Sequence, residues 1–200
     1  MASDRCHVAG VQLWVPERFT DSRGVFSETY NAQTLAERGI THPFVQDNEV
    51  FSAAQGTLRG LHWQAPPHAQ AKLVRCISGA IYDVVVDLRR DSDTFGQWQG
   101  FELSADAGEQ LYVPEGLAHG YITRAPDTRV VYKCSRVYAP FAERALRWDD
   151  PTLAIDWGVS SPQLSERDAN APLWADIVGL LGAERASVAG VQAVGEGVSP

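Results

Sequence analysis

The sequence predicts a mainly β protein, an antiparallel barrel or sandwich with short flanking helices. Between Val45 and Tyr138, short segments rich in Val, Ile, Leu and Tyr alternate with clusters of Gly, Pro, Asp and Ser, which is typical of such folds. The 17 glycines and six tryptophans also favour strands and turns. We expect one domain, residues 1–182, because no repeat or linker divides the chain. Residues 183–200 have no periodic pattern and are expected to form a flexible tail.

Two short helices are expected at the flanks of this β region. Asn31 suits the position that caps the amino end of a helix, and Gly39 suits the position that ends one, so a first helix is predicted between them. The run Pro172–Leu181 is amphipathic, and Pro172 fits the first turn of a second helix. The predicted architecture is therefore a β domain with a short helix on either side.

The clearest strand signal covers Ala71–Leu88. One face of its first strand carries Lys72, Val74, Cys76 and Ser78, because side chains in a strand alternate between two faces. The dipeptide Ser78-Gly79 then turns the chain, and Ile81–Leu88 is expected to form the return strand.

A similar pair of strands is expected at Glu109–Val113 and Val130–Val137. In the second of these, Val130, Tyr132 and Cys134 share one face. The same alternation sends Tyr132 into the barrel interior that Lys72 faces.

The composition restricts the partners and the location of the protein. A formal net charge of −8 argues against general affinity for nucleic acid, which needs clustered Lys and Arg. No apolar run approaches the length that crosses a bilayer, and the amino end lacks the pattern of a signal peptide. The odd cysteine count, Cys6, Cys76 and Cys134, fits reduced thiols, and the last two are expected in the core. We therefore expect a cytoplasmic protein without membrane partners.

Two motifs resemble the signatures of the cupin fold, a double-stranded β-helix or jelly-roll barrel. The first is Gly56-Thr-Leu-Arg-Gly-Leu-His62-Trp-Gln64, and the second is Gly108-Glu-Gln-Leu-Tyr-Val-Pro-Glu-Gly-Leu-Ala-His119. Cupins commonly hold a metal with two histidines and a carboxylate from the first motif and a histidine from the second. Here Gln64 stands where the second histidine would be, and Lys72 stands near the position of the carboxylate. Because an ammonium group has no lone pair and repels a cation, we expect the pocket without the metal.

Three residues of this predicted pocket can move protons. His62 should share the cavity with Arg59 and Lys72, and a histidine among cations tends to stay neutral and can act as a base. Lys72 can donate to an oxyanion as it forms, unless it only points to solvent. The hydroxyl of Tyr132, unless the side chain only packs, can supply a proton from the opposite side. Such a set indicates racemisation or epimerisation next to a carbonyl.

Two arginines add a preference for an anionic ligand. Arg23 and Arg59 each precede a glycine, and planar guanidinium groups bind phosphate oxygens bidentately. We therefore expect the substrate to carry an anionic group such as a nucleotide diphosphate.

From about Val11 to Leu181 the chain resembles the dTDP-4-dehydrorhamnose 3,5-epimerases, cupin-fold enzymes that act on deoxysugar nucleotides. Besides the two cupin motifs, the resemblance rests on five ordered blocks. These are Asp21-Ser-Arg-Gly-Val-Phe-Ser-Glu28, Phe44-Val-Gln-Asp-Asn48, Ala71-Lys-Leu-Val74, Val131-Tyr-Lys-Cys-Ser135 and Leu164-Ser-Glu-Arg-Asp-Ala169.

The resemblance implies a role for each matching residue. His62 would be the base that takes the C3 or C5 proton of a 4-keto sugar, with Asp168 as its dyad partner. Lys72 would face the enolate oxygen, and Tyr132 would be the acid on the other face. Binding roles are implied for Gln46, Asn48, Arg59 and Arg167 at the diphosphate and sugar, for His119 in the sugar pocket and for Tyr138 near the nucleotide. Arg23, Phe26 and Glu28 would reach the nucleotide of a neighbouring subunit, which implies a homodimer. No cofactor or metal is implied.

The predicted activity is thus metal-independent epimerisation of dTDP-4-keto-6-deoxyglucose at C3, C5 or both. Val50 stands where the family commonly has a serine, and Arg167 where many members have lysine. Because Val50 lies in a segment close to the sugar, a single-site epimerase of a related 4-keto sugar nucleotide is the first alternative. A ketoisomerase of similar fold, a metal-dependent cupin oxygenase and a non-catalytic sugar-nucleotide binding module are the others.

Overall fold

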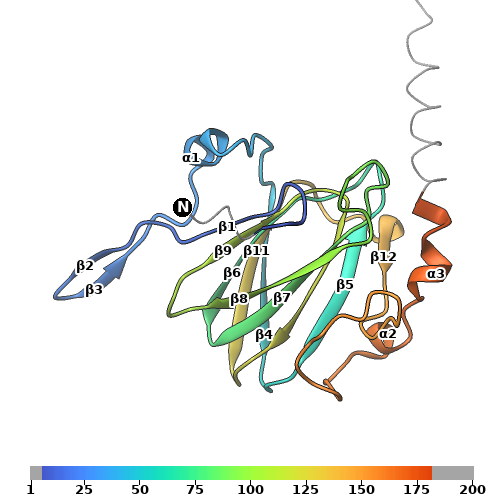
Figure 1. Ribbon diagram of the computed structural model, residues 1–200. Coiled ribbons are helices and arrows are strands. Elements are labelled where there is room, and N and C mark those ends of the chain that lie inside the picture. Colours follow the sequence, from blue (N-terminus) through green and yellow to red (C-terminus); the bar gives the residue numbers. More distant parts are fainter. Residues whose placement is uncertain (1–5, 182–200) are drawn as a thin grey trace, which may run out of the picture.

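The computed structural model describes residues 6–181, and it consists mainly of two five-stranded antiparallel sheets that face each other (Figure 1). The first sheet has the order β1 (Gln12–Trp14), β9 (Gln110–Val113), β6 (Lys72–Ser78), β11 (Thr128–Cys134) and β4 (Gln46–Ser52). The second has the order β12 (Glu143–Ala145), β5 (Leu58–Gln64), β10 (Leu117–Thr123), β7 (Ala80–Asp87) and β8 (Trp98–Ser104). This is the jelly-roll barrel of the cupin fold, so the predicted fold class is confirmed.

The main core fills the space between the two sheets. Its buried residues come from both of them, including Val74 on β6, Leu111 on β9, Val85 on β7 and Leu103 on β8. The alternation of side chains places every second residue of these strands in the interior. Apolar burial between the sheets therefore fixes the register of the strands.

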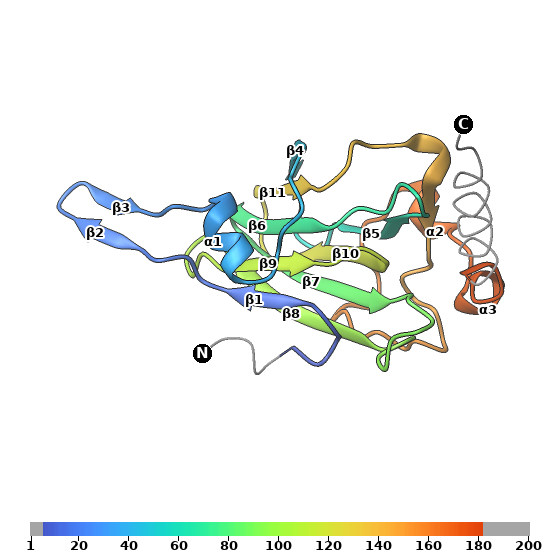
Figure 2. The ribbon, with the colours of Figure 1, turned by 90° about the horizontal axis from the view of Figure 1, so that it is seen from above.

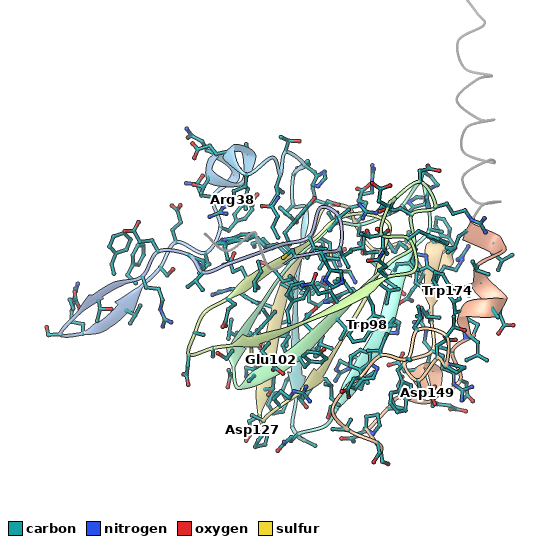
Figure 3. All side chains as sticks on the ribbon, in the orientation of Figure 1. Arg38, Trp98, Glu102, Asp127, Asp149 and Trp174 are labelled. Atoms are coloured by element: carbon teal, nitrogen blue, oxygen red, sulfur yellow. The ribbon has the colours of Figure 1, made fainter. Side chains whose placement is uncertain are left out.

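Two smaller apolar clusters cover the outer faces of the sheets. Helix α1 (Ala32–Glu37) places Leu35 with Trp14 and Leu73 on the outer face of the first sheet. The segment after β12, with α2 (Glu166–Ala169) and α3 (Trp174–Ile177), covers the outer face of the second sheet. Trp98 and Trp174, both labelled in Figure 3, pack against this second cluster. The carboxyl-terminal segment is thereby held on the wall that carries β5.

One hairpin stands away from the barrel. Strands β2 (Phe19–Asp21) and β3 (Gly24–Phe26) pair only with each other and project outward in both views (Figures 1 and 2). Phe19 and Phe26 are more than half exposed on it. The hairpin therefore contributes little to the core of its own chain.

The predicted strands exist, but both predicted pairings are wrong. Strands β6 and β7 follow each other through a turn at Gly79, whose φ is +74°, yet they lie in different sheets. Strands β9 and β11 lie in one sheet, with β6 hydrogen-bonded between them. Alternation fixes which face of a strand is buried, whereas the partner of a strand is decided by contacts between distant segments.

The first helix agrees with its prediction, and the second is shorter than expected. Asn31 caps α1 through its side chain, which accepts hydrogen bonds from the amides of Gln33 and Thr34, and Gly39 follows with a φ of +81°. Helix α3 begins only at Trp174, where the Asp176 carboxylate accepts from the Leu173 amide. Pro172 lies before the helix, and its carbonyl accepts a hydrogen bond from the Arg147 amide.

Three further features bear on the predictions. Cys76 and Cys134 are buried, as expected, and all three thiols are free. No helix between residues 6 and 181 is long and apolar enough to cross a membrane. The predicted tail, residues 183–200, lies outside the described residues.

Candidate active site

A cavity of about 460 Å³ is lined by residues from both sheets. Its walls bring together seven of the residues selected from the sequence: Arg59, His62, Lys72, His119, Tyr132, Arg167 and Asp168. They come from β5, β6, β10, β11 and α2. We call this cavity the barrel pocket.

A close contact between two strands places the two histidines of the motifs side by side. Gly60 has a φ of +124°, and a β-carbon there would lie 2.5 Å from Cα of Gly120. Glycine at both positions lets β5 and β10 approach, so His62 and His119 are register partners. Any larger residue at Gly60 would separate the strands that carry them.

His62 is bonded to Asp168. Its Nε2 lies 2.6 Å from Oδ1 of Asp168, whose side chain is 5% exposed. Ser165 caps α2 by accepting a hydrogen bond from the backbone amide of Asp168, which holds the backbone of that residue at the start of the helix. Burial acts to raise the pKa of Asp168, but the hydrogen bond and the charge of His62 outweigh it and lower that pKa. The ionised carboxylate accepts a hydrogen bond from Nε2–H of His62, so Nδ1 carries the free lone pair of the imidazole.

A second buried carboxylate, Asp83, lies behind His119 and Lys72. Both oxygens of Asp83 lie 2.9 Å from Nε2 of His119, and Nδ1 of His119 lies 3.4 Å from Nζ of Lys72. Burial lowers the pKa of His119, although the Asp83 charge opposes this shift. The neutral imidazole accepts a hydrogen bond from the lysine on one side and donates to the carboxylate on the other.

Lys72 and Tyr132 meet as the alternation of their strands predicted. Nζ of Lys72 lies 6.0 Å from the ring centroid of Tyr132. Burial lowers the pKa of Lys72 and raises the pKa of Tyr132. Tyr132 therefore keeps its proton at neutral pH and faces the pocket from the first sheet, while His62 faces it from the second.

A polar cluster lies near Arg167, and its central acceptor is Glu143. One oxygen of Glu143 accepts from Arg167 at 2.7 Å and from the Tyr138 hydroxyl at 2.5 Å. Burial favours a higher pKa for Glu143, but these two hydrogen bonds outweigh it and lower the pKa. Gln46 belongs to the same cluster. Its side-chain oxygen accepts a hydrogen bond from the Tyr138 amide, and its side-chain nitrogen donates one to Oδ1 of Asn48.

Asn48 and Gln46 lie on β4, beside the barrel pocket. Asn48 lines a separate cavity of about 410 Å³ that also contacts Leu73, Arg75 and Tyr132. Leu73 and Arg75 alternate with the inward residues of β6, so this cavity extends onto the outer face of the first sheet. The structure thus separates these two residues from the direct lining of the barrel pocket.

The hairpin residues do not reach the barrel pocket of their own chain. The Arg23 side chain is 88% exposed and pairs with Asp21 at 2.6 Å. Phe26 is 68% exposed, and Glu28 lines a different cavity beside α1. Within the described chain these three residues form a separate surface.

The position of Gln64 differs from that of a metal ligand. Its amide nitrogen donates to the carbonyl of His68, and its amide oxygen accepts from the Ala139 amide. Both ends of the side chain are therefore bonded to backbone. Across residues 6–181, no three His, Cys, Asp or Glu side chains come together as a metal site would require.

Asp83, Glu143 and Ser165 are not among the residues selected from the sequence. Asp83 had a usable signal, because a carboxylate between Tyr82 and three valines interrupts an apolar strand and a buried charge needs a partner. Ser165 also had a local signal, because it lies three residues before Asp168 and caps the helix that carries it. Glu143 carried no such signal, since its partner Arg167 lies on another element and only the folded chain brings the two together.

The comparisons with known proteins agree with one another. The family model described as dTDP-4-dehydrorhamnose 3,5-epimerase matches residues 5–176. A relative of that name from Shigella flexneri is 42% identical over 173 residues, covering 86% of this chain and 95% of its own.

Two solved structures extend the agreement to the fold. The dTDP-4-dehydrorhamnose 3,5-epimerase of Bacillus anthracis, solved with TDP and PPi bound, is 49% identical with a TM-score of 0.83, over 84% of this chain and 97% of that one. The dTDP-6-deoxy-D-glucose-3,5-epimerase of Legionella pneumophila, in complex with dTDP-4-keto-L-rhamnose, is 40% identical with a TM-score of 0.83, over 88% of this chain and 94% of that one. The chain therefore belongs to the dTDP-4-dehydrorhamnose 3,5-epimerase family.

Proposed function

We propose that this chain inverts C3 and C5 of dTDP-4-keto-6-deoxyglucose through an enolate, toward dTDP-4-keto-L-rhamnose. One arrangement carries the proposal: His62, bonded to Asp168 at 2.6 Å, and Tyr132 face the barrel pocket from opposite sheets. Inversion of a carbon needs a base on one face and an acid on the other. The arrangement supplies both.

Each inversion proceeds in two proton transfers. Nδ1 of His62 takes the proton from the carbon next to the C4 carbonyl, and the electron pair of that bond moves to the carbonyl oxygen. Asp168 stabilises the imidazolium that forms. Tyr132 then gives its hydroxyl proton to the opposite face of the carbon, and the carbonyl re-forms.

Lys72 stabilises the charge that develops on the C4 oxygen. Its ammonium group lies in the pocket and is held by Nδ1 of His119. A fixed cation in a site of low polarity favours the enolate over the ketone. The reaction as proposed takes its positive charge from this residue and uses no metal or cofactor.

Arginines bind the diphosphate of the substrate. Arg59 lies in the barrel pocket and donates to the Ser52 hydroxyl at 3.3 Å. Arg167 lies on α2 next to Asp168. Two guanidinium groups at the same cavity suit an anion with several oxygens. Gln46 and Asn48 lie beside this pocket on β4 and would contact the diphosphate and the sugar. Tyr138, whose amide donates to Gln46, would lie near the nucleotide.

A homodimer completes the nucleotide site. Arg23, Phe26 and Glu28 lie on or after a hairpin that leaves its own barrel. Exposed aromatic and charged residues on such an arm suit the pocket of a second copy, where Phe26 would pack on the nucleotide. The molecular mass in solution and the activity of Phe26→Ala test this part of the proposal.

Solvent exchange tests the activity. The protein is incubated with dTDP-4-keto-6-deoxyglucose in heavy water, and proton NMR follows the sugar. We expect deuterium at both C3 and C5 and signals of the inverted product. His62→Ala should abolish exchange, whereas His7→Ala, at an exposed histidine bonded to the Trp98 carbonyl, should leave it unchanged. The absence of exchange at both carbons in the unaltered protein would sink the proposal.

A single-site epimerase is the second candidate. It is favoured by Val50, which lines the barrel pocket and offers the sugar an apolar contact instead of a hydrogen bond. Deuterium at only one carbon, followed by exchange at both in Val50→Ser, would support this candidate over the first. A product with a displaced carbonyl would indicate a ketoisomerase instead.

A further inference from the structure

Arg75 is an arginine without a partner in its own chain. It lies on β6, the central strand of the first sheet, and is half-buried. Between residues 6 and 181, the side chain of every other arginine makes a hydrogen bond, an ion pair or a ring contact, whereas that of Arg75 makes none. A guanidinium group that is partly withdrawn from water is normally bound by a carboxylate or by carbonyl oxygens. The acceptor for Arg75 therefore has to come from outside the described residues.

Arg75 lies in the middle of a sheet face that is only partly covered. Because side chains alternate along a strand, Arg75 and Ile77 share this outer face with Val131 and Phe51 of the neighbouring strands. Helix α1 covers the end of the face near Leu73, whereas Phe51 is 46% exposed and Ile77 is 38% exposed. We call the uncovered part the open face. It consists of Arg75 and Ile77 on β6, Val131 on β11, and Glu49 and Phe51 on β4.

The open face carries charges of both signs. Glu49 pairs with Arg129 at 2.6 Å within its own chain, and its side chain remains 53% exposed. A carboxylate has two oxygens and can accept from a second donor, so Glu49 can bind another cation. A partner of a single charge sign, such as nucleic acid, would meet this carboxylate as well as Arg75. A second copy of the face offers a carboxylate to the arginine and an arginine to the carboxylate.

The register of the strands shows how two copies fit together. Arg75 and Glu49 are both register partners of Val131, one on each side of β11. Two sheets pack face to face about 10 Å apart. A two-fold axis that runs between them along β11 places β6 of one copy opposite β4 of the other, so that Arg75 of each copy lies opposite Glu49 of the other. The same axis brings Ile77 of one copy toward Phe51 of the other, which adds an apolar contact beside each ion pair.

The hairpin of β2 and β3 begins beside the open face. Thr29 and Tyr30, which follow β3, line a cavity of about 410 Å³ together with Arg75, Glu49 and Val131. A second copy that the hairpin contacts is therefore brought next to the open face. Both surfaces thus suit the same partner.

We propose that the open face binds the same face of a second copy of this chain, with Arg75 of each copy bound to Glu49 of the other. The inference names the interface of the homodimer in the proposed function and rests on that homodimer. Every contact occurs twice in a two-fold dimer, so the interface contains two such ion pairs. Arginine and aromatic residues near the centre of an interface contribute most of its binding free energy.

Reversing the charge at each of the two positions tests the inference. In Arg75→Glu two carboxylates meet across the interface, and in Glu49→Arg two guanidinium groups meet. For each variant alone, analytical ultracentrifugation should therefore give a dimer dissociation constant at least about 100-fold above that of the unaltered protein. An equimolar mixture of the two variants should form a dimer again, because it contains one native pair and one exchanged pair. A recovered dimer also shows that both variants are folded.

Arg147→Glu is the matched control. Arg147 pairs with Asp149 at 2.9 Å in the segment that covers the second sheet, where Asp149 is labelled in Figure 3, so this variant should keep the dissociation constant of the unaltered protein.

Three results would overturn the inference. The first is a monomeric unaltered protein, and the second is a variant, Arg75→Glu or Glu49→Arg, that alone dimerises as tightly as the unaltered protein. The third is a mixture of these two variants that forms no dimer. Deuterium exchange in the unaltered protein judges the proposed epimerisation separately, so failure of the interface and failure of the activity are distinct results.

Discussion

The carboxylate of Asp168 lies 2.6 Å from Nε2 of His62, although the two residues are 106 positions apart in the chain. The histidine belongs to β5 in the second sheet, and the aspartate belongs to α2, a single helical turn that packs beside it. The short helix thus places one carboxylate beside the histidine, and its cap, Ser165, bonds the backbone amide of Asp168.

Removing the charge of Asp168 should slow the proposed epimerisation. In Asp168→Asn the neutral amide no longer stabilises the imidazolium of His62, so we expect kcat to fall by about 100-fold. Exchange and inversion should fall together, because both need the base. Glu166→Gln, at an exposed position on the same helix, is the control and should keep the normal rate. An Asp168→Asn variant with full activity would contradict the dyad.

Asp83 should affect the reaction through His119 and Lys72. In Asp83→Asn the side-chain amide can donate a hydrogen bond to Nε2 of His119. The imidazole proton then lies on Nδ1, where it faces the Lys72 ammonium in place of the lone pair that accepted from it. We therefore expect at least about tenfold slower deuterium exchange at the sugar. The control is Asp87→Asn on the same strand, which lies outside the lining of the barrel pocket. Equal exchange rates for the two variants would refute the role of Asp83.

Asp87 should make the stability of the fold depend on pH in the acid range. Burial acts to raise the pKa of Asp87, but hydrogen bonds from Arg89, Ser92 and Thr94 outweigh it and lower the pKa from 3.8 to about 2. Because the pKa in the folded state is the lower one, the stabilisation is complete above pH 3.8 and is lost as the pH falls toward 2. The shift corresponds to about 2 kcal/mol.

Chemical denaturation of Asp87→Asn measures this contribution. Between pH 6 and about pH 2 the free energy of unfolding of the variant should fall less than that of the unaltered protein, by about 2 kcal/mol. Parallel curves for the two proteins would show that Asp87 has an ordinary pKa in the folded state.

Gly60→Ala should disrupt the fold at the barrel pocket. The added β-carbon would meet backbone atoms of Gly120 and His119 at 2.5 and 2.9 Å, and neither can move without separating β5 from β10. We expect a loss of about 3 kcal/mol in the free energy of unfolding. Gly39→Ala is the control, since its φ is +81° with nothing within 4 Å, and it should cost about 1 kcal/mol. Similar losses for the two variants would contradict the steric argument.

The sequence by itself determined which side chains face inward. The alternation along β6 and β11 assigned Lys72, Val74, Val130 and Tyr132 to one interior, and the structure has them there. The Asn31 cap and Gly39 likewise defined the first helix. These features depend on neighbouring residues alone, because strand and helix geometry repeats over two to four positions.

Only the tertiary structure decided which strands are partners and which charges meet. Strands β6 and β7 were expected to pair and instead joined opposite sheets. The contacts of Asp83 with His119 and of Glu143 with Arg167 also join residues far apart in the chain. Local periodicity fixes the direction of a side chain but carries no information about its distant neighbour. The burial of apolar faces between the sheets selects the strand order, and the strand order then brings the proton-transfer residues into one pocket.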